Sequence, residues 1–144
     1  RRRLADELNS IRLKLASHFN EFEDYFDVDS MPLEVCKLSR SSRSKICKED
    51  AYAFPDKDYC AAQSSNYYGY KLHAVCSVNG VFQSIGLSPA SVHDINYLKD
   101  IKSQISDCTL IGDRGYLSTE IQLNLFETYN ITLSTPMRNN QKDF

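Results

Sequence analysis

The sequence has no long apolar run, and this lack argues against two classes of protein. Nowhere do eighteen apolar residues follow one another, and residues 1–6, Arg-Arg-Arg-Leu-Ala-Asp, lack the apolar stretch of a signal peptide. A transmembrane helix and a secretory signal each need such a stretch. The sequence therefore predicts neither membrane insertion nor secretion, and we expect a cytoplasmic protein.

Closely spaced cysteine pairs are also missing. The five cysteines form an odd number, and no two of them have the C-x-x-C spacing. Disulfide frameworks use even sets of cysteines, and structural zinc sites use closely spaced pairs, so both are disfavoured. With 144 residues, of which 42% are hydrophobic and 25% are charged, the chain is long enough to form one domain around its own core.

The net charge is only −2, but the basic residues are unevenly placed. The segment from Cys36 to Lys48 contains no acidic residue. Its basic residues are Lys37, Arg40, Arg43, Lys45 and Lys48. Such a run is most often a solvated loop. Because this one closely follows a strand that is predicted to end at Asp29, we also consider all five residues as candidates for DNA binding.

Apolar spacing in the first half predicts a helix, a strand and a long loop. The helical stripe consists of Leu4, Leu8, Ile11, Leu15, Phe19 and Phe22, spaced by three and four residues. We interpret residues 1–23 as a helix that is the remnant of, or the linker from, a preceding DNA-binding region. A strand follows at residues 25–29, and Pro32 is expected to end its ladder. Residues 31–66 are predicted to be an insertion loop.

The second half predicts four more strands and two helices. Residues 68–78 and 81–87 alternate around the turn formed by Asn79 and Gly80. Ser91 is expected to cap a helix at residues 92–104. A strand at 109–112, a helix from Ser118 with Ile121, Leu125 and Phe126 inward, and a strand at 131–134 follow. This order predicts an α/β protein: a ribonuclease H-like mixed five-stranded sheet, in the order 3-2-1-4-5, with helices on its faces.

Two aspartates end strands that are neighbours in that sheet. Asp29 closes the first strand, and Asp113 follows the fourth. Carboxylates that meet at one edge of a sheet can hold a divalent metal for phosphoryl transfer on a nucleic acid. Asp27 shares a strand face with Asp29, because the side-chain period of a strand is two, and it is the less favoured alternative. Without further information, Asp113 could equally begin a turn.

Four sequence blocks carry a resemblance to a known family. They are Asp-Ser-Met-Pro-Leu-Glu-Val-Cys at 29–36, Tyr-Gly-Tyr-Lys-Leu-His at 68–73, Ser-Val-His-Asp at 91–94 and Gly-Asp-Arg-Gly-Tyr at 112–116. The blocks occur in the family's order and cover about residues 25–140. By these blocks the chain resembles the DDE transposases of bacterial insertion sequences, and most of all the group named after insertion sequence 982.

The resemblance implies a DNA transposase catalytic domain at residues 24–144. Asp29 and Asp113 would be its first two catalytic carboxylates and would bind two Mg2+ (or Mn2+) ions for phosphodiester hydrolysis and strand transfer. The family's third acid, a glutamate, is expected beyond Phe144, so we expect the chain alone to be inactive. The implied partners are double-stranded DNA, as insertion-sequence ends and as target, and other copies of the protein in a homo-oligomeric active complex.

Several residues and the function itself have alternative interpretations. Lys71, His73 and Arg114 are further DNA-binding candidates, although a packed or surface position explains the first two equally well, and Arg114 could instead pair with an acid. His93 and Asp94 are interpreted mainly as helix-capping residues, and contact with the active site is the less favoured alternative. The chain could also be a ribonuclease H-like nuclease, or an inactive transposase remnant that binds DNA or a protein without cutting.

Overall fold

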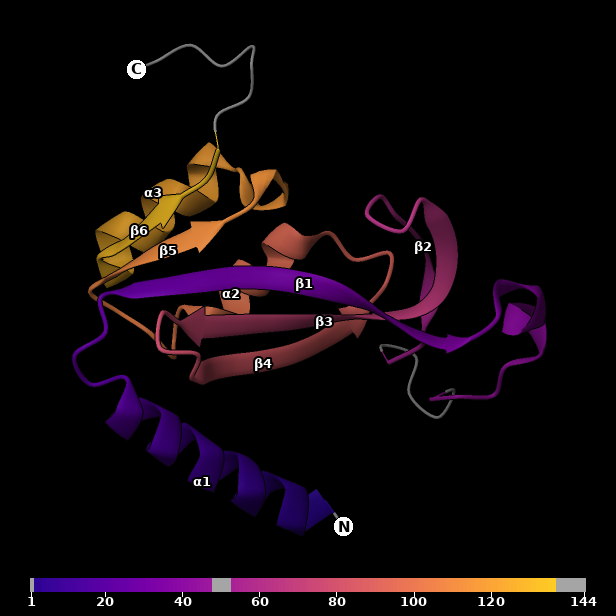
Figure 1. Cartoon of the computed structure of the whole chain (residues 1–144), viewed down its shortest axis with the longest axis horizontal. Coiled ribbons are helices and arrows are strands. Elements are labelled where there is room, and N and C mark those ends of the chain that lie inside the picture. Colours follow the sequence, from indigo (N-terminus) through magenta and orange to yellow (C-terminus); the bar gives the residue numbers. More distant parts are fainter. Residues whose placement is uncertain (1, 48–52, 137–144) are drawn as a thin grey trace.

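The computed structural model describes residues 2–47 and 53–136, so Lys48 of the basic segment lies outside the described residues. The centre of the protein is a mixed sheet (Figure 1). The strands are β1 (Tyr25–Cys36), β2 (Asp56–Cys60), β3 (Ser65–Ser77), β4 (Phe82–Pro89), β5 (Cys108–Gly112) and β6 (Ile131–Ser134). Their order is β2-β3-β1-β5-β6, and β4 also pairs with β3. Apart from β2, this is the predicted order.

β1 is longer than predicted, and Pro32 does not end its ladder. The strand continues to Cys36, with Pro32 paired opposite Lys71 of β3. β5 pairs with β1 only from Tyr25 to Val28. Among the described residues, one edge of β1 is therefore open beyond Val28, and a residue that lacks an N–H is tolerated at an open edge.

The predicted insertion loop at 31–66 is wrong over much of its length. It contains the second half of β1, the short 3₁₀ helix η1 (Leu38–Arg43) and the strand β2. β3 is long enough to carry two partners along one edge, because β2 pairs with its residues 65–69 and β4 with its residues 70–76. The polar composition of β2, Asp-Lys-Asp-Tyr-Cys, suits a strand at the border of a sheet. Because it has no apolar alternation, this strand could not be recognised from the sequence.

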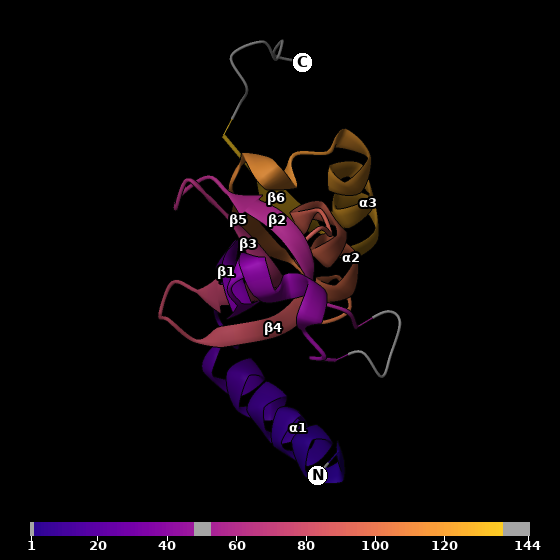
Figure 2. The same ribbon diagram turned by 90° about the vertical axis from the view of Figure 1, so that its right-hand side faces the viewer.

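The helices α2 (Leu98–Ile101) and α3 (Thr119–Tyr129) cover one face of the sheet, not both (Figure 2). They share a single core with the inward side chains of β1, β3, β5 and β6. Among its members are Val75, Leu98, Ile101, Leu110, Leu125 and Ile131, none of them more than 1% exposed. In the described part of the chain the opposite face of the sheet has no helix on it.

The predicted helix at 92–104 is much shorter than expected. It consists of the 3₁₀ turn η2 (Asp94–Tyr97) followed by α2, and its N-cap is His93 rather than Ser91. The His93 side chain accepts a hydrogen bond from the backbone N–H of Ile95. In α3, Leu125 is buried as predicted, but Phe126 is 57% exposed, because adjacent residues on a helix point 100° apart.

The amino-terminal helix α1 (Arg2–Phe19) lies against the edge strand β4 (Figure 1). Arg12 links α1 to β4, because its Nη1 donates hydrogen bonds to the carbonyl oxygens of Phe82 and Gln83, both at 3.2 Å. No helix within the described ranges is long and apolar enough to cross a membrane. The strand order, the parallel pairing of β1 with β5 and the helices between the later strands fit the predicted ribonuclease H-like fold.

Candidate active site

The sheet register brings Asp29 and Asp113 to adjacent positions. β1 and β5 run parallel, and the last pair in their register is Val28 with Gly112. The next residue in β1 is Asp29, and the residue directly after β5 is Asp113. Neighbouring strands lie about 4.8 Å apart, so the two backbones are side by side where the carboxylates begin. Phe26 and Val28 are buried whereas Asp29 and Asp113 are exposed, and both carboxylates therefore lie away from the core.

Local hydrogen bonds hold each of these carboxylates. Asp113 is the N-cap of the 3₁₀ turn η3 (Arg114–Tyr116), and its Oδ1 accepts from the backbone N–H of Gly115 at 2.8 Å. Asp29 Oδ1 accepts from the backbone N–H of Ser30 at 2.7 Å. Each of these hydrogen bonds uses only Oδ1 of the carboxylate, so Oδ2 of each side chain takes no part in it.

Asp94 is a third carboxylate near Asp113; the sequence favoured a capping role for it, with contact with the site as the less favoured alternative. A Cβ placed on Gly115 would lie 2.9 Å from Asp113 Oδ1 and 3.6 Å from Asp94 Oδ2. The two carboxylates are thus no farther apart than these two distances added together. A side chain at position 115 would fill the space between them, which explains the glycine in this turn.

Asp94 is held by an ion pair with Lys71. Lys71 Nζ lies 3.3 Å from Asp94 Oδ1 and 3.0 Å from Asp58 Oδ2. It also donates a hydrogen bond to the carbonyl oxygen of Val92 at 3.1 Å. Asp94 Oδ1 is buried and accepts no hydrogen bond, so the charge of Lys71 is its main compensation. Lys71 therefore links β3, β2 and the loop before η2.

The hydroxyl of Tyr116 is buried among the carboxylates without a hydrogen-bond partner. The side chain is only 1% exposed, and its oxygen has no partner in hydrogen-bonding geometry. Burial raises the pKa of Tyr116 far above its ordinary value, and the negative charge of Asp94 raises this pKa further. Ser30 opposes this increase, and the charges of Asp29 and Asp113 add smaller increases. The phenol therefore stays neutral.

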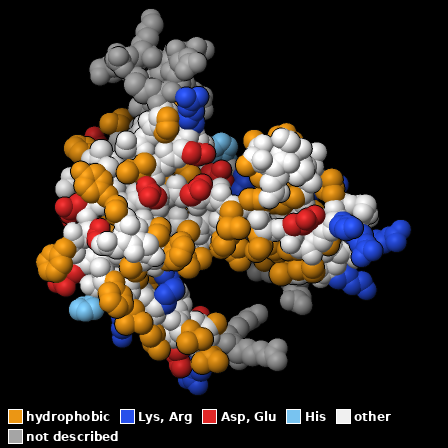
Figure 3. Space-filling view, viewed as in Figure 1, with side chains coloured by type: hydrophobic (Ala, Val, Ile, Leu, Met, Phe, Trp, Pro, Cys, Tyr) orange, Lys and Arg blue, Asp and Glu red, His pale blue; other side chains and the backbone are white. Residues whose placement is uncertain are grey.

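Asp29 lies on a sheet face that is otherwise apolar. In the register of β1, β3 and β4, Asp29 is in line with Ala74 and Ile85, and the next row on this face contains Met31, Leu72 and Leu87. Ile85, Met31 and Leu87 are each about half exposed or more. Figure 3 looks onto this side, where acidic side chains are surrounded by hydrophobic ones, whereas the basic side chains gather at the far end of β1.

Comparison with known proteins shows the family of the chain. The family model described as the transposase DDE domain matches residues 20–144. The chain belongs to this family. No curated protein and no solved structure gives a significant match. The predicted relationship to DDE transposases is confirmed, while the narrower resemblance to the insertion sequence 982 group stays a prediction.

In this DDE domain the register favours Asp29 over Asp27 as the partner of Asp113. Asp27 is also exposed, but it pairs with Ile111, two residues before Asp113. Its charge acts on Cys76, whose pKa is raised by burial and, to a smaller extent, by Asp27. Asp27 is therefore one strand period farther from the end of β5 than Asp29.

Lys71 and His73 lie on the face of the DDE domain opposite to Asp29. They alternate with Ala74, which is the β3 residue paired with Asp29. Lys71 is engaged with two carboxylates. His73 is 1% exposed, its Nε2 lies 2.8 Å from Ser88 Oγ, and its ring stacks on Tyr97 with centroids 4.7 Å apart. We therefore no longer consider either side chain a DNA contact.

The buried His73 should make the stability of the domain depend on pH. Desolvation lowers the pKa of His73, opposed by Asp94 and Asp100 and assisted by Lys71. Its Nδ1 is buried without a partner, so a proton there would find no acceptor. Because the folded-state pKa lies below the unfolded value of about 6.5, stability should fall as the pH drops from about 6.5 through the folded-state pKa.

We expect His73→Gln to reduce this loss, because glutamine takes up no proton. The measurement is urea denaturation of the wild type and the variant at pH 7.5 and at lower pH. Equal pH dependence of the two proteins would contradict the prediction.

The basic segment is not next to Asp29, as the sequence suggested, but at the other end of β1. Cys36 lies seven residue steps after Asp29 along the extended chain, or about 23 Å at 3.3 Å per step. Lys37, Arg40 and Arg43 then follow at intervals of three on and before η1. A 3₁₀ helix has three residues per turn, so these three side chains share one face. Arg114, in contrast, is exposed directly beside Asp113.

Proposed function

We propose that this domain catalyses metal-dependent cleavage and strand transfer of DNA at the ends of an insertion sequence. The observation that carries the proposal is the adjacency of Asp29 and Asp113 in the β1–β5 register, in a chain of the transposase DDE family. The substrate would be double-stranded DNA, with the element ends cut first and the target joined afterwards.

The residues present fit a divalent metal. Asp29 and Asp113 offer carboxylate oxygens on an exposed face, at neighbouring strand ends. No group of three or more His, Cys, Asp or Glu side chains within the described ranges is arranged to enclose a metal. Mg2+ needs only one or two protein carboxylates, because water and phosphate oxygens complete its octahedron.

Asp29 and Asp113 would hold Mg2+ or Mn2+, and such ions, when bound, activate a water or hydroxyl nucleophile and stabilise the leaving oxygen. The chain's own residues supply position. The sheet fixes the spacing of the two aspartates, and the Gly115 N–H orients Asp113. Lys71 holds Asp94 behind them. Arg114, exposed beside Asp113, is proposed to bind a phosphate next to the one that is cut.

The row formed by Lys37, Arg40 and Arg43 is proposed to bind the DNA backbone away from the cut. The 23 Å or so between it and Asp29 corresponds to about seven base pairs at 3.4 Å each. DNA that runs along β1 from the carboxylates would reach this row within one helical turn. Lys45 follows the same turn and is proposed to extend the contact.

Replacing Lys37, Arg40 and Arg43 together by Ala should weaken DNA binding in a salt-dependent way. If each contacts one phosphate, the slope of log affinity against log salt should become shallower by about 2.7, since each contact contributes about 0.9. Fluorescence anisotropy over a salt series measures this slope. The matched control replaces the exposed Lys14, Lys57 and Lys99 by Ala, which removes the same charge elsewhere. This control should make the slope shallower by less than the first triple variant does. Equal slopes for both triple variants would contradict a localised contact.

The test of the function is DNA cleavage by the gene product that contains this chain. Incubated with DNA carrying the element's ends, it should nick at those ends in Mg2+ or Mn2+ and lose the activity in EDTA. Binding without cleavage would favour the inactive remnant. Cleavage that needs no element end and joins no strands would favour a ribonuclease H-like nuclease.

A further inference from the structure

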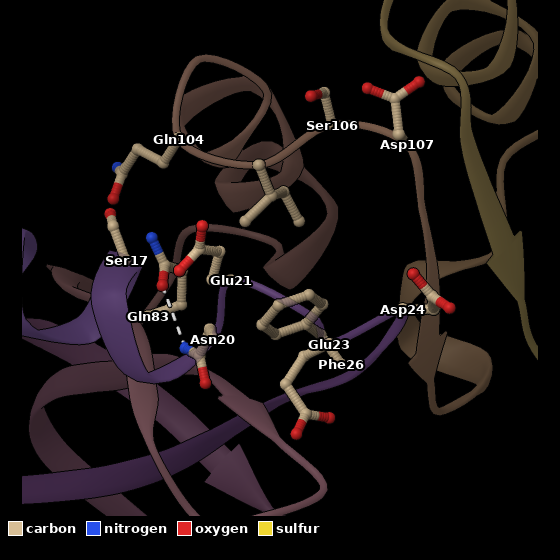
Figure 4. A pocket seen from close by; sticks show the side chains of 11 residues that line it. Ser17, Asn20, Glu21, Glu23, Asp24, Phe26, Gln83, Gln104, Ser106 and Asp107 are labelled. Carbon is tan, nitrogen blue, oxygen red and sulfur yellow. Dashed lines mark hydrogen bonds between the residues drawn. The ribbon is translucent and has the colours of Figure 1, made fainter.

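A cavity of about 310 Å3 lies where the end of α1 meets the sheet (Figure 4). Its lining residues come from the end of α1 and the turn that follows it, from β1, from β4, and from the loop between α2 and β5. No Lys or Arg is among the described residues that line it. The lining contains four carboxylates, which belong to Glu21, Glu23, Asp24 and Asp107.

The hydrogen-bond partners known for these carboxylates are neutral. Glu23 accepts a hydrogen bond from the side-chain amide of Asn79, and Asp107 accepts one from Asn130 at 3.0 Å. The described part of the chain contains two ion pairs, both made by Lys71, and neither involves a carboxylate of the cavity. Four negative charges therefore line one cavity without a cation to compensate them.

Two of these carboxylates approach each other where β1 and β5 begin. Tyr25 pairs with Thr109, whose backbone N–H also donates to the carbonyl oxygen of Asp24 at 2.7 Å. Burial raises the pKa of the Cys108 thiol to about 11, and the charges of Asp107 and Asp24 both add to this increase. Asp24 and Asp107 thus act on the same atom. Like charges this near repel each other, and a cation between them would relieve the repulsion.

A buried amide oxygen in the same lining has no hydrogen-bond partner among the described residues. Asn20 lines the cavity and is only 8% exposed, and Figure 4 shows its amide among the surrounding side chains. Its Nδ2 donates to Gln83 Oε1 at 2.9 Å, which leaves Oδ1 buried and unpaired. A buried acceptor without a donor is unfavourable. The lining is therefore suited to a group that brings donors as well as positive charge, and an ammonium has three donors and no acceptor.

The arrangement of the lining favours an extended cation over a metal ion. No group of three or more His, Cys, Asp or Glu side chains in the described ranges is placed to enclose a metal. The lining also has an apolar part, formed by the buried side chains of Phe26 and Ile105. The volume corresponds to about ten water molecules at roughly 30 Å3 each, and so to roughly ten non-hydrogen atoms.

We propose that this cavity binds an aliphatic polyamine, with its ammonium groups on the carboxylates and its methylene groups against Phe26 and Ile105. A triamine such as spermidine has about the number of atoms that the volume holds. Its charges are separated by methylene groups, as dispersed carboxylates and an apolar surface require. An ammonium group that enters beside Asn20 would give Oδ1 the donor it lacks.

A polyamine bound there would strengthen the attachment of α1 to the sheet. The side-chain hydrogen bonds described between α1 or its end and β4 are those of Arg12 and the one between Asn20 and Gln83. A ligand that contacts α1, the sheet and the loop before β5 together stabilises the folded state. The inference does not rest on the proposed catalytic function. Asp24 lies five residue steps before Asp29, about 17 Å at 3.3 Å per step, and the test needs no cleavage.

The experiment is a titration of the whole 144-residue chain with spermidine at low salt and pH 7, followed by the backbone amide NMR signals. Signals of residues 17–26, 83 and 104–107 should shift and saturate with a dissociation constant on the order of 0.1–1 mM. The melting temperature should rise by a few degrees at saturation. Butylamine, which has one ammonium on a similar stem, should bind about tenfold more weakly or less. Mg2+ at equal ionic strength should not shift these signals selectively.

Substitutions in the lining then locate the binding. Asp24→Asn with Asp107→Asn should weaken spermidine binding about tenfold or more, because two charge-assisted contacts are lost. Asparagine keeps the shape of aspartate and tolerates the positive φ of 53° at Asp107. The control, Glu7→Gln with Glu127→Gln, removes the same charge from exposed positions outside the cavity and should bind spermidine as the wild type does.

Ser17→Lys gives an independent test, because it leaves every carboxylate in place. Ser17 is exposed and lines the cavity, so a lysine there can supply an ammonium group from within the chain and should abolish the spermidine-induced shifts. Circular dichroism checks that each variant is folded, and Ser17→Lys decides if the double variant is not. Shifts spread evenly over the acidic surface, equal responses to Mg2+ and spermidine, or undiminished binding by Ser17→Lys would overturn the proposal.

Discussion

Asp29→Asn or Asp113→Asn should each reduce DNA cleavage by the gene product on the order of a thousandfold or more, the loss expected when a preorganised electrostatic group is removed. Asparagine preserves the shape of the side chain but removes the charge that would bind a divalent metal. Single-turnover cleavage of end-labelled DNA in Mg2+ measures the effect. Binding of the same DNA should change little, because phosphate contacts are assigned to basic residues.

Asp27→Asn is the matched control. It makes the same chemical change on the same strand face, one strand period away, beside Ile111 instead of Asp113. It should retain most of the cleavage activity. Mn2+-induced broadening of backbone amide signals gives a second readout in this chain: signals near residues 29 and 113 should broaden in the wild type and in Asp27→Asn, but less in Asp113→Asn. Cleavage that survives both proposed site substitutions would show that the metal is held elsewhere.

The order of the strands could be predicted because their local signals were strong. Alternation along residues 68–78 and the turn at Asn79 and Gly80 indicated the hairpin of β3 and β4, and Gly80 does have a positive φ of 81°. The apolar run of β5 and the later helical segment indicated crossovers between parallel strands. From these, the adjacency of the strand ends that carry Asp29 and Asp113 followed.

The length of β1 and the existence of β2 could not be predicted from local pattern. Pro32 normally ends a ladder, and it is tolerated here only because β5 stops at Gly112 and leaves an edge of β1 open. β2 has no apolar alternation, and it exists because β3 extends beyond β4 and offers it an edge. Both are effects of tertiary pairing. The extension of β1 to Cys36 also places the basic segment away from the carboxylates.

The position of Asp94 near Asp113 was ranked below a capping role for a similar reason. The Ser-Val-His-Asp block at 91–94 was noticed, but a helix-capping interpretation accounted for it locally. What brings Asp94 to the site is its ion pair with Lys71, twenty-three residues earlier in the chain, and the small Gly115 between it and Asp113. Local pattern therefore offered a sufficient reason for the acid, and only tertiary contacts show its second neighbour.

Lys71→Met should destabilise the domain by about 2–3 kcal/mol, below the 3–5 kcal/mol expected for breaking a fully buried pair, because these groups are partly solvated. The Lys71 side chain is 15% exposed, and those of Asp94 and Asp58 are 23% and 33% exposed. Methionine keeps the length and apolar stem of lysine but leaves two carboxylates without their cation. Urea denaturation at pH 7 measures the loss.

The exposed Lys57→Met provides the control and should stay within about 0.5 kcal/mol of the wild type. The double variant Lys71→Met with Asp94→Asn separates the ion pair from packing. If the instability of Lys71→Met comes from an uncompensated carboxylate, removing that charge should restore part of the stability, so that the two substitutions are not additive. Full additivity would mean that Lys71 acts through its stem alone. In that case Asp94 would be held in place by η2 rather than by charge, and its position near Asp113 would survive the loss of Lys71.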